Sequence, residues 1–302
     1  MVRRYKILLR NKGIRADDYY FNKIHRVVNE LHSKYHYDCC IVNYFYLSKV
    51  LTHISYIPIR ILLTHDVFSF RNINTGAKCC ATTPHEEAKA IRRAPVILAI
   101  QKNDACFFHV LSPTSTIYTT YNRYTYTPSA VIGNNNILFL SGSALFNLTG
   151  IRRFIEEVFP LILISYPSAK LIVGGKICEL LTAYKDSSYI RLVGYVEDVQ
   201  SFYEKGDIVI NPTYLGSGLK IKTFESVSYD KVTIARTHSS DGIYDENTVP
   251  IYFSDDPQQW SKYISDMWQN IDYIITKKRE NRNYIESLNQ YIDNQYDAIF
   301  KI

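Results

Sequence analysis

Residues 211–225 read Asn-Pro-Thr-Tyr-Leu-Gly-Ser-Gly-Leu-Lys-Ile-Lys-Thr-Phe-Glu, and this stretch decides the fold. The pattern predicts that a buried strand ends, that a Gly-Ser-Gly turn follows, and that a helix then begins. Glycines let the backbone approach a ligand, and the start of a helix offers free N–H groups to phosphate oxygens. Glu225 lies two turns into this helix, where a carboxylate can reach a ribose diol. The same residues also fit a plain strand–helix turn with a solvated glutamate.

The second half of the chain repeats this alternation of strand, small-residue turn and helix. Strands are expected at residues 136–140, 169–173, 189–193, 207–210 and 231–235, and helices at 150–164, 198–205 and 219–229. Pro160 is expected to kink or end its helix, and residues 257–302 form an amphipathic helical tail. Such alternation predicts a doubly wound parallel sheet with its ligand beyond the carboxyl ends of the strands. The turns expected there are 141–143, 174–176, 194–196, 211–218 and 237–242.

The first half follows a similar but less regular pattern. Residues 19–34 and 85–93 have helical periodicity, and the apolar runs 38–44, 60–63 and 95–100 predict strands, the first of them buried. The Tyr-, Thr- and Pro-rich stretch 112–130 has no helical period, so it is expected to end one domain and form a linker.

Composition limits the possible functions. The chain has 302 residues, enough for two domains that each bury a core. Its net charge of +6 suits an anionic ligand or a negatively charged membrane face. No run of Lys or Arg is long enough to follow a nucleic-acid backbone, so nucleic acid is not an expected partner.

Cysteine usage and the absence of a secretory or membrane-spanning run point to a cytoplasmic chain. The six cysteines fit no zinc spacing and are expected to be reduced thiols; they are Cys39, Cys40, Cys79, Cys80, Cys106 and Cys178. The start MVRRYKILLRNKG contains no secretory apolar region, and no apolar run is long enough to span a bilayer. The expected location is therefore the cytoplasm, including the inner face of the membrane.

Three segments together resemble one known family. Residues 211–225 and the strand at 231–235 resemble the donor-site signature of GT-B fold glycosyltransferases, in particular the retaining group 1 (GT4-like) enzymes. Residues 137–162 and 192–212 resemble the beginning and the middle of the same C-terminal domain. The resemblance covers about 136–302 and extends less clearly into the first half, where the family's first strand and its Gly-rich loop have no counterpart.

The resemblance implies an α/β chain with two Rossmann-like parallel-sheet domains. Residues 1–130 would form a shortened acceptor-side domain, 131–275 the domain that binds the nucleotide-sugar donor, and 276–302 a helix that packs back toward the first domain. It also implies the roles of individual residues. Glu225 would bind the donor ribose, and Ser217 occupies the position of a carboxylate that relatives place beside the sugar.

Further donor contacts follow from the same resemblance. Backbone N–H groups of the turn at Gly216 and of Gly218, Leu219 and Lys220 would bind the pyrophosphate, and Lys220 or Lys222 would neutralise the leaving diphosphate. Tyr195 and Val196 match the segment that lines the base pocket, although Tyr195 also fits a core position. Gly142 and Asn147 match the loop that faces the donor.

In the first half, His65 and Asp66 match a His-Asp pair near the acceptor side, with a structural, turn-capping Asp as the alternative. Arg71 and Gln101 are weaker candidates, and His85-Glu86-Glu87 is not a zinc motif. We expect neither a metal nor a cofactor beyond the nucleotide sugar itself.

The resulting prediction is a metal-independent glycosyltransferase that moves a sugar from a nucleotide diphosphate donor to a hydroxyl acceptor with retention. The acceptor would be a glycan, a lipid-linked glycan or a protein, in the synthesis of a surface glycan, with peripheral membrane contact. One alternative is a weak or inactive homologue that acts as a binding or partner subunit. Another is a sugar-phosphate epimerase of the same fold, which would need no acceptor.

Overall fold

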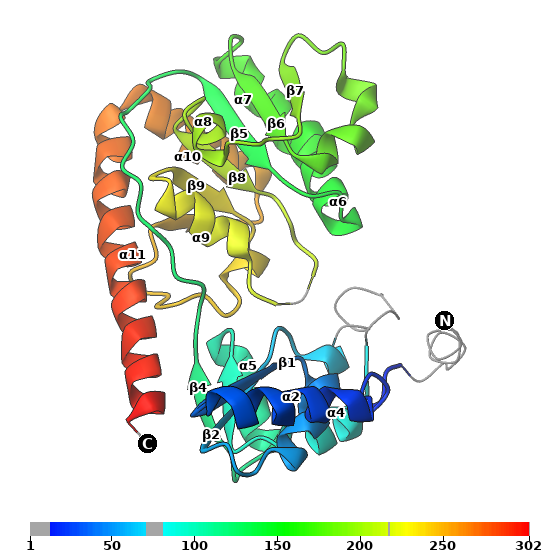
Figure 1. Ribbon diagram of the computed structural model, residues 1–302. Helices are drawn as coiled ribbons and strands as arrows, with labels where there is room; N and C mark the ends of the chain where they lie inside the picture. Colours follow the sequence, from blue (N-terminus) through cyan, green and yellow to red (C-terminus); the bar gives the residue numbers. More distant parts are fainter. Residues whose placement is uncertain (1–12, 71–80, 217, 302) are drawn as a thin grey trace. The chain divides into compact units, whose positions relative to one another are not determined.

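A computed structural model describes residues 13–70, 81–216 and 218–301 (Figure 1). The chain divides into two compact units. Unit 1 comprises Met1–Asn122, Gly216–Leu219 and Tyr291–Ile302, and unit 2 comprises Arg123–Leu215 and Lys220–Gln290. The boundaries predicted from the sequence, at 130/131 and 275/276, stay predictions. No helix in the described ranges is long and apolar enough to cross a membrane.

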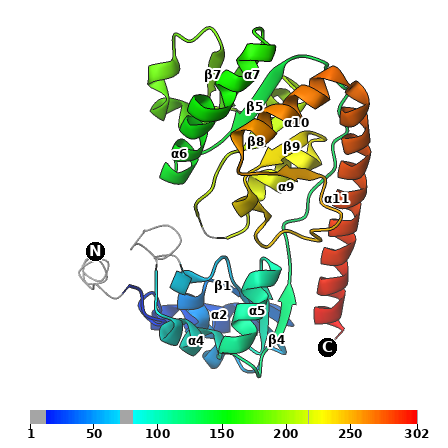
Figure 2. The same ribbon diagram turned by 180° about the vertical axis from the view of Figure 1, so that it is seen from behind.

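Unit 1 contains a four-stranded parallel sheet in the order β1-β2-β3-β4. The strands are β1 (Cys39–Asn43), β2 (Ile59–Leu63), β3 (Val96–Ala99) and β4 (Thr116–Thr119). The helices are α2 (Asn22–Tyr35), α4 (Pro84–Ile91) and α5 (Lys102–Leu111), with a 3₁₀ helix, η1, at Phe45–His53. Figure 1 shows α2 and Figure 2 shows α4 and α5 around this sheet.

The core of unit 1 follows from the apolar runs of the central strands. All four residues of the inner strand β3 are buried, and its side chains pack into core clusters on both faces of the sheet. One face of the sheet packs through Leu62 and Ile97, and the other through Ile61 and Leu98, where Ile299 from the end of the chain is also buried. The sequence predicted these strands to within two residues at each end.

One expectation for unit 1 is wrong, and one strand was not predicted. Residues 38–44 do not form a buried strand, because β1 lies at the edge of the sheet and Ile41 is exposed. The stretch 112–130, which was expected to end one domain and form a linker, contains the unpredicted strand β4, which pairs with β3 from Val96↔Thr116 to Ala99↔Thr119. β3 lies twenty residues earlier in the chain than β4. The sequence of residues 116–119 has no hydrophobic alternation that would predict a strand.

Unit 2 contains a six-stranded parallel sheet in the order β10-β9-β8-β5-β6-β7. Its strands are β5 (Asn136–Leu140), β6 (Lys170–Gly174), β7 (Ile190–Gly194), β8 (Ile208–Asn211), β9 (Val232–Ala235) and β10 (Ile251–Phe253). The chain builds outward from β5 through β6 and β7, and then returns to place β8 on the other side of β5. The order of the strands therefore reverses between β5 and β8.

Helices cover both faces of this sheet, as expected for strands that are apolar throughout. The helices are α6 (Leu145–Arg153), α7 (Phe159–Ser165), α8 (Val199–Tyr203), α9 (Ile221–Ser228), α10 (Pro257–Gln269) and α11 (Ile271–Phe300). Residues of α6, α7 and α10 share one large core cluster, whereas Phe202 and Tyr203 of α8 pack with Leu138, Ile172 and Val209 on the opposite face. Figures 1 and 2 show the two faces in turn.

Three details of unit 2 differ from the sequence prediction. The helix expected at 150–164 begins at Leu145 and passes through a π-helical turn at Phe154–Val158 before α7, in whose first turn Pro160 lies. Proline has no N–H group, and it is well tolerated in the first turn of a helix. The tail is two helices, because Asn270 separates them and its side chain accepts a hydrogen bond from Asp272 N at 3.0 Å. The short strand β10 was not predicted.

Gly175 provides a test of the fold at the end of β6. Its φ of +91° disfavours any residue with a side chain, and an added Cβ would lie 2.3 Å from the carbonyl oxygen of Ser141. We expect Gly175→Ala to destabilise the protein by about 1–3 kcal/mol, measured by denaturant unfolding. Gly142→Ala is the control, because an added Cβ there meets nothing within 4 Å. Equal stability of the two variants would contradict this packing.

Candidate functional site

The candidate site of unit 2 lies at the carboxyl ends of β5 and β8, where the strand order reverses. β5 ends at Leu140 and leads into α6, and β8 ends at Asn211 and leads through a loop into α9. In doubly wound sheets, ligands bind beyond the strand ends at such a reversal. We call the five residues that meet here the β5/β8 edge: Ser141, Gly142, Asn147, Thr213 and Lys222.

Lys222 connects the two sides of this edge. Its Nζ donates to Ser141 Oγ at 2.5 Å and to Asn147 Oδ1 at 3.1 Å. The amide of Asn147 is itself held in place, because its Nδ2 donates to Gly142 O at 3.2 Å and its Oδ1 also accepts from Thr213 Oγ1 at 3.4 Å. Ser141 and Asn147 are buried, so the ammonium is bound by neutral acceptors inside the domain.

The burial of Lys222 has an electrostatic consequence. Desolvation lowers the pKa of Lys222 to about 8, and the nearby Glu225 carboxylate opposes this shift. Its Nζ also lies 5.7 Å from the centroid of the Phe139 ring. An ammonium that has given up water for two neutral oxygens gains strongly from an anion placed beside it. The β5/β8 edge is therefore suited to binding a negatively charged group.

Buried hydroxyl groups fix the position of α9. Asn211 Nδ2 donates to Thr223 Oγ1 at 3.0 Å, and Ser226 Oγ and Thr233 Oγ1 are 2.8 Å apart. Thr223, Ser226 and Thr233 have no exposed surface. Because hydrogen bonds are directional, they hold the start of the helix in register over the strand ends more closely than apolar packing alone would.

The turn before α9 has the backbone conformation that its glycines predict. Gly216 and Gly218 have φ values of +119° and +75°, and Leu219 and Lys220 lead into the helix. The side chain of Lys220, the N-cap residue of α9, makes no capping hydrogen bond. Ser217 lies outside the described residues. The positive φ values of the two glycines agree with the expected turn, whereas the pyrophosphate contacts of Gly216, Gly218, Leu219 and Lys220 stay predictions.

The loop between β8 and this turn is held by contacts with α6 and with the segment after β9. The ring of Tyr214 lies 4.9 Å from the guanidinium of Arg153 and 5.8 Å from that of Arg236. Gly150 of α6 allows the loop to approach, since an added Cβ would lie 2.7 Å from Pro212 O. The loop that carries Thr213 is thus held by contacts that the sequence did not reveal.

Glu225 lies one turn after Lys222 on α9 and is half-buried. Its Oε1 accepts a hydrogen bond from Tyr203 OH at 2.9 Å. Tyr203 is buried, and its ring stacks on that of Tyr229 at 4.8 Å between centroids. Burial and the Glu225 carboxylate raise the pKa of Tyr203 well above its ordinary value, so the phenol stays a donor. One carboxylate oxygen of Glu225 is therefore held from behind by a rigid aromatic side chain.

Tyr195 and Val196 follow β7 and differ in their surroundings. Tyr195 is 83% exposed, so its interpretation as a core tyrosine is wrong. Val196 is partly buried beside Phe202, and both would lie within 3.0 Å of a Cβ added at Gly174. An exposed aromatic ring at a strand end is free to contact a planar base, which leaves the predicted role of Tyr195 in place as a prediction.

In unit 1, His65 follows β2 and lies beside two residues from the end of β1. Its Nε2 is 2.9 Å from Asn43 Oδ1, and its ring centroid is 4.3 Å from that of Tyr44. Tyr44 has a φ of +68°, a strained value for a residue with a side chain, and such strain is common at functional sites. Burial lowers the pKa of His65, which favours the neutral imidazole.

The remaining candidates of unit 1 occupy the same edge of its sheet. Asp66 is buried after β2, and Gln101 is buried after β3 with its Nε2 donating to Asp104 Oδ1 at 2.6 Å. Arg71 lies outside the described residues. Within those that are described, no group of three His, Cys, Asp or Glu side chains gathers to hold a metal ion.

The structure thus brings Gly142, Asn147 and Lys222 into contact and places Glu225 one turn beyond. His65 and Asp66 belong to unit 1. Sequence reasoning placed Ser141 and Thr213 within turns at the ligand side of the sheet but gave them no role, and it missed Tyr203 and Asn43. Asn43 is a polar residue at the end of a strand, a signal that could have been used, whereas nothing in the sequence marks Tyr203.

Two sequence comparisons bear on this site. Residues 134–270 match the family model of glycosyl transferases group 1. A Klebsiella pneumoniae protein, described as an uncharacterized 44.6 kDa protein in a cps region, is 24% identical over 151 residues. This match covers 46% of the present chain and 38% of the Klebsiella protein, so the chain spans well under half of that relative.

Solved structures share the fold at low sequence identity. TarM from S. aureus superposes with a TM-score of 0.70 at 13% identity, covering 91% of this chain and 57% of TarM. HepE from Anabaena, solved in complex with UDP, gives 0.66 at 14% identity over 91% and 82% of the two chains. Sucrose-phosphate synthase from Thermosynechococcus elongatus gives 0.65 at 13% identity over 92% and 78%.

The matched segment contains all six strands of unit 2, the β5/β8 edge and Glu225. The reversed strand order, the glycine turn before α9 and the family match therefore agree. Residues 134–270 of this chain are therefore similar to the glycosyl transferases of group 1, and the chain has the GT-B fold with two parallel sheets.

Proposed function

We propose that the protein is a glycosyltransferase that transfers a sugar from a nucleoside diphosphate sugar to a hydroxyl acceptor. Unit 2 would bind the donor at the β5/β8 edge, and unit 1 would contribute acceptor-side residues, with His65 and Asp66 as the candidates. The proposal includes no metal ion and no cofactor besides the donor.

One observation carries this proposal: α9 presents a buried ammonium and a fixed carboxylate three residues apart. Residues at i and i+3 lie on the same side of a helix, so Lys222 and Glu225 face one ligand. The ammonium suits a diphosphate, and a carboxylate accepts hydrogen bonds from two neighbouring hydroxyls, as in a ribose. The spacing matches a nucleoside diphosphate, whose ribose lies next to its α-phosphate.

In this reaction, Lys222 would stabilise the negative charge that develops on the leaving group. During transfer, the bond between the anomeric carbon and the diphosphate oxygen breaks, and a bond to the acceptor oxygen forms while the acceptor hydroxyl loses its proton. Negative charge builds on the leaving diphosphate. An ammonium that is already positioned by Ser141 and Asn147 stabilises this charge without having to reorganise.

The finer parts of the proposal rest on relatives. HepE was solved with UDP and TarM with UDP and α-GlcNAc-glycerol, which supports a uridine nucleotide as the first donor to test. We include retention of the anomeric configuration from the family resemblance. The Klebsiella relative in a cps region supports a surface glycan as the product. A cytoplasmic location at the inner face of a membrane belongs to the same proposal.

A binding or partner subunit without activity is the alternative, motivated by Ser217 at a position where relatives have a carboxylate. Such a subunit would bind a nucleotide but would neither transfer nor hydrolyse a sugar. Donor binding and donor turnover therefore have to be measured separately.

Donor binding is tested by thermal shift with UDP, GDP and ADP. We expect one of them to raise the melting temperature, because ligand at 100 times its Kd adds about 2.7 kcal/mol to the stability of the folded state. Glu225→Ala should abolish the shift, whereas Glu286→Ala, on an exposed part of α11, should retain it. No shift with any nucleotide would count against a donor site. A shift without turnover of the matching sugar nucleotide would favour the binding subunit.

The pKa of Lys222 predicts how nucleotide affinity depends on pH. Only the protonated amine attracts the diphosphate, and in the free protein it loses its proton as the pH rises through about 8. Affinity for the diphosphate should therefore be highest below pH 8 and fall above it. Isothermal titration calorimetry across pH 6–10 measures this, with that range chosen as roughly two units either side of the shifted pKa.

Two variants test whether Lys222, and not another titrating group, causes the decline in nucleotide affinity above pH 8. Lys222→Met should weaken binding about 10- to 100-fold at pH 7 and remove the decline above pH 8, since it deletes a charged hydrogen bond. Lys262→Met, on the exposed side of α10, should behave like the unmodified protein. A pH profile that persists in Lys222→Met would assign the titration elsewhere, for example to Lys231, whose pKa burial also lowers to about 8.

Tyr203→Phe tests whether the phenol positions Glu225. Loss of one hydrogen bond should raise the KM for the donor about three- to tenfold and leave kcat nearly unchanged, because the ribose takes no part in bond breaking. Tyr166→Phe is the matched control, since its hydroxyl donates to a backbone carbonyl, Ser265 O at 3.3 Å, on α10. An unchanged KM in Tyr203→Phe would mean that Glu225 does not depend on this contact.

A further inference from the structure

Helix α2 of unit 1 is unusual because none of its residues is buried. It has fourteen residues, Asn22–Tyr35, and its sequence is clearly amphipathic. An amphipathic helix on a globular protein normally buries its apolar stripe against the core. Here Ile24 and Val28 touch the core cluster of unit 1 but stay partly exposed. The helix is therefore attached along one side of its apolar face only.

The other side of the apolar face is open. Val27, Leu31 and Tyr35 are 50%, 42% and 54% exposed. They follow one another at spacings of four residues, so they form a continuous row along the helix. Phe21, just before the helix, is also 50% exposed. We call Phe21, Val27, Leu31 and Tyr35 the α2 apolar row.

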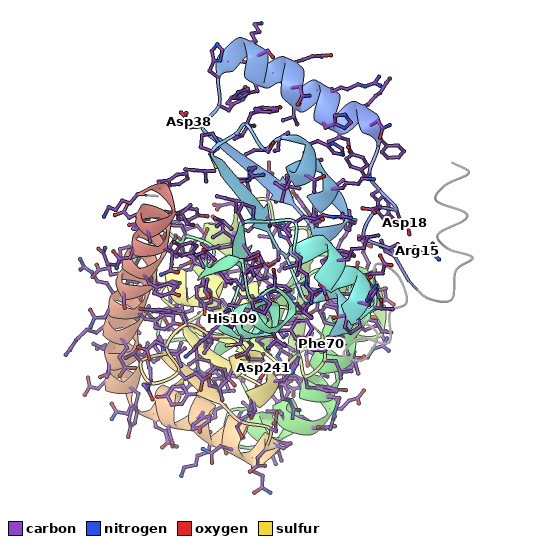
Figure 3. All side chains as sticks on the ribbon, turned by 90° about the horizontal axis from the view of Figure 1, so that it is seen from below. Arg15, Asp18, Asp38, Phe70, His109 and Asp241 are labelled. Carbon is purple, nitrogen blue, oxygen red and sulfur yellow. The ribbon has the colours of Figure 1, made fainter. Side chains whose placement is uncertain are left out.

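Basic residues flank this row. The helix contains Lys23, Arg26 and Lys34 against a single acidic residue, Glu30. On a helical wheel, Lys23 and Lys34 lie directly beside Val27, and the ammonium of Lys34 lies 4.9 Å from the centroid of the Tyr35 ring. Figure 3 shows α2 between the labelled Asp18 and Asp38, with a row of side chains on its side away from the sheet of unit 1.

The two histidines of α2 lie on its inner side and contact residues of unit 1. His25 lies against Tyr20 and His53, with a Tyr20 OH to His25 Nδ1 distance of 2.5 Å, and His32 lies against Tyr56. Of the two acidic residues before the helix, Asp17 is paired with Arg93 at 2.7 Å and with Lys89 at 3.3 Å, and Asp18 accepts a hydrogen bond from Arg15 N at 2.9 Å. The basic residues beside the apolar row are thus not neutralised by these groups.

We propose that α2 is a membrane-docking helix that lies in the headgroup region of an anionic lipid bilayer. A helix of this kind places its apolar row at the boundary with the acyl chains, and its lysines and arginine attract anionic headgroups. A lipid surface fits better than a protein groove, because the row is narrow and its polar edge carries three basic residues against one acidic residue. The inference extends the proposed membrane contact and assigns it to particular residues.

The test measures binding of the full chain to lipid vesicles by co-sedimentation. Vesicles of phosphatidylcholine with phosphatidylglycerol should bind the protein, and those of phosphatidylcholine alone should bind it much more weakly. Raising the salt concentration should weaken binding, because it screens the lysines from the headgroups. No sugar transfer is measured, so failure of this proposal and failure of the proposed activity are distinguishable.

Two double variants separate the apolar and the charged contributions. Lys23→Glu with Lys34→Glu should weaken vesicle binding by about fivefold or more for each position, since each basic residue near an anionic surface contributes about that factor. The double variant Val27→Ser with Leu31→Ser should also bind the vesicles more weakly. Because it keeps the basic residues, any binding that remains should still weaken as the salt concentration rises. Far-ultraviolet circular dichroism and the melting temperature establish that each variant is folded.

A matched control removes two other exposed apolar residues. Val110 on α5 and Ile164 on α7 are even more exposed than those of the α2 row. Val110→Ser with Ile164→Ser should leave vesicle binding unchanged. The proposal is overturned if the anionic vesicles fail to bind, if the control variant loses as much binding as the α2 variants, or if sedimentation equilibrium shows that the α2 row mediates a dimer instead.

Discussion

A buried ammonium requires acceptors, and the candidate site depends on how Lys222 obtains them. Its two partners, Ser141 and Asn147, come from the segment after β5, whereas Lys222 itself comes from the helix after β8. These segments are about eighty residues apart in the chain and meet only because β5 and β8 are neighbours in the sheet. The ammonium therefore joins the two halves of the unit 2 sheet at the point where the strand order reverses.

The partners of Lys222 are neutral, and this has consequences for binding. A carboxylate partner would satisfy the ammonium fully and would compete with a diphosphate for it. Two neutral oxygens hold the side chain in place while leaving most of its charge uncompensated, which the lowered pKa reflects. Glu225 is held differently, by the phenol of Tyr203 behind it, so the two groups on α9 are positioned independently. A cation and an anion one turn apart on the same helix can then bind different parts of one ligand, although the Glu225 carboxylate partly offsets the effect of burial on Lys222.

Unit 1 uses its surface in another way. The carboxyl edge of its sheet gathers Asn43, Tyr44 and His65, with backbone strain at Tyr44, whereas its outer helix α2 leaves an apolar row uncovered. Both features cost stability: one through an unfavourable φ value, the other through apolar surface left in water. Such costs are common where a protein binds something else. The first fits a small polar ligand, and the second fits an extended apolar surface.

The sequence alone determined the class of fold, the positions of most strands and the glycine turn before α9. Apolar runs of four to five residues and φ-permissive glycines act locally, so their pattern is readable along the chain. It also singled out Lys222 and Glu225, through the family signature. Only the tertiary structure decided what these residues touch. The partners Ser141, Asn147 and Tyr203, the pairing of β4 and the exposure of α2 depend on contacts between distant segments. Their energies come from the geometry of strand order and helix packing, which no local pattern encodes.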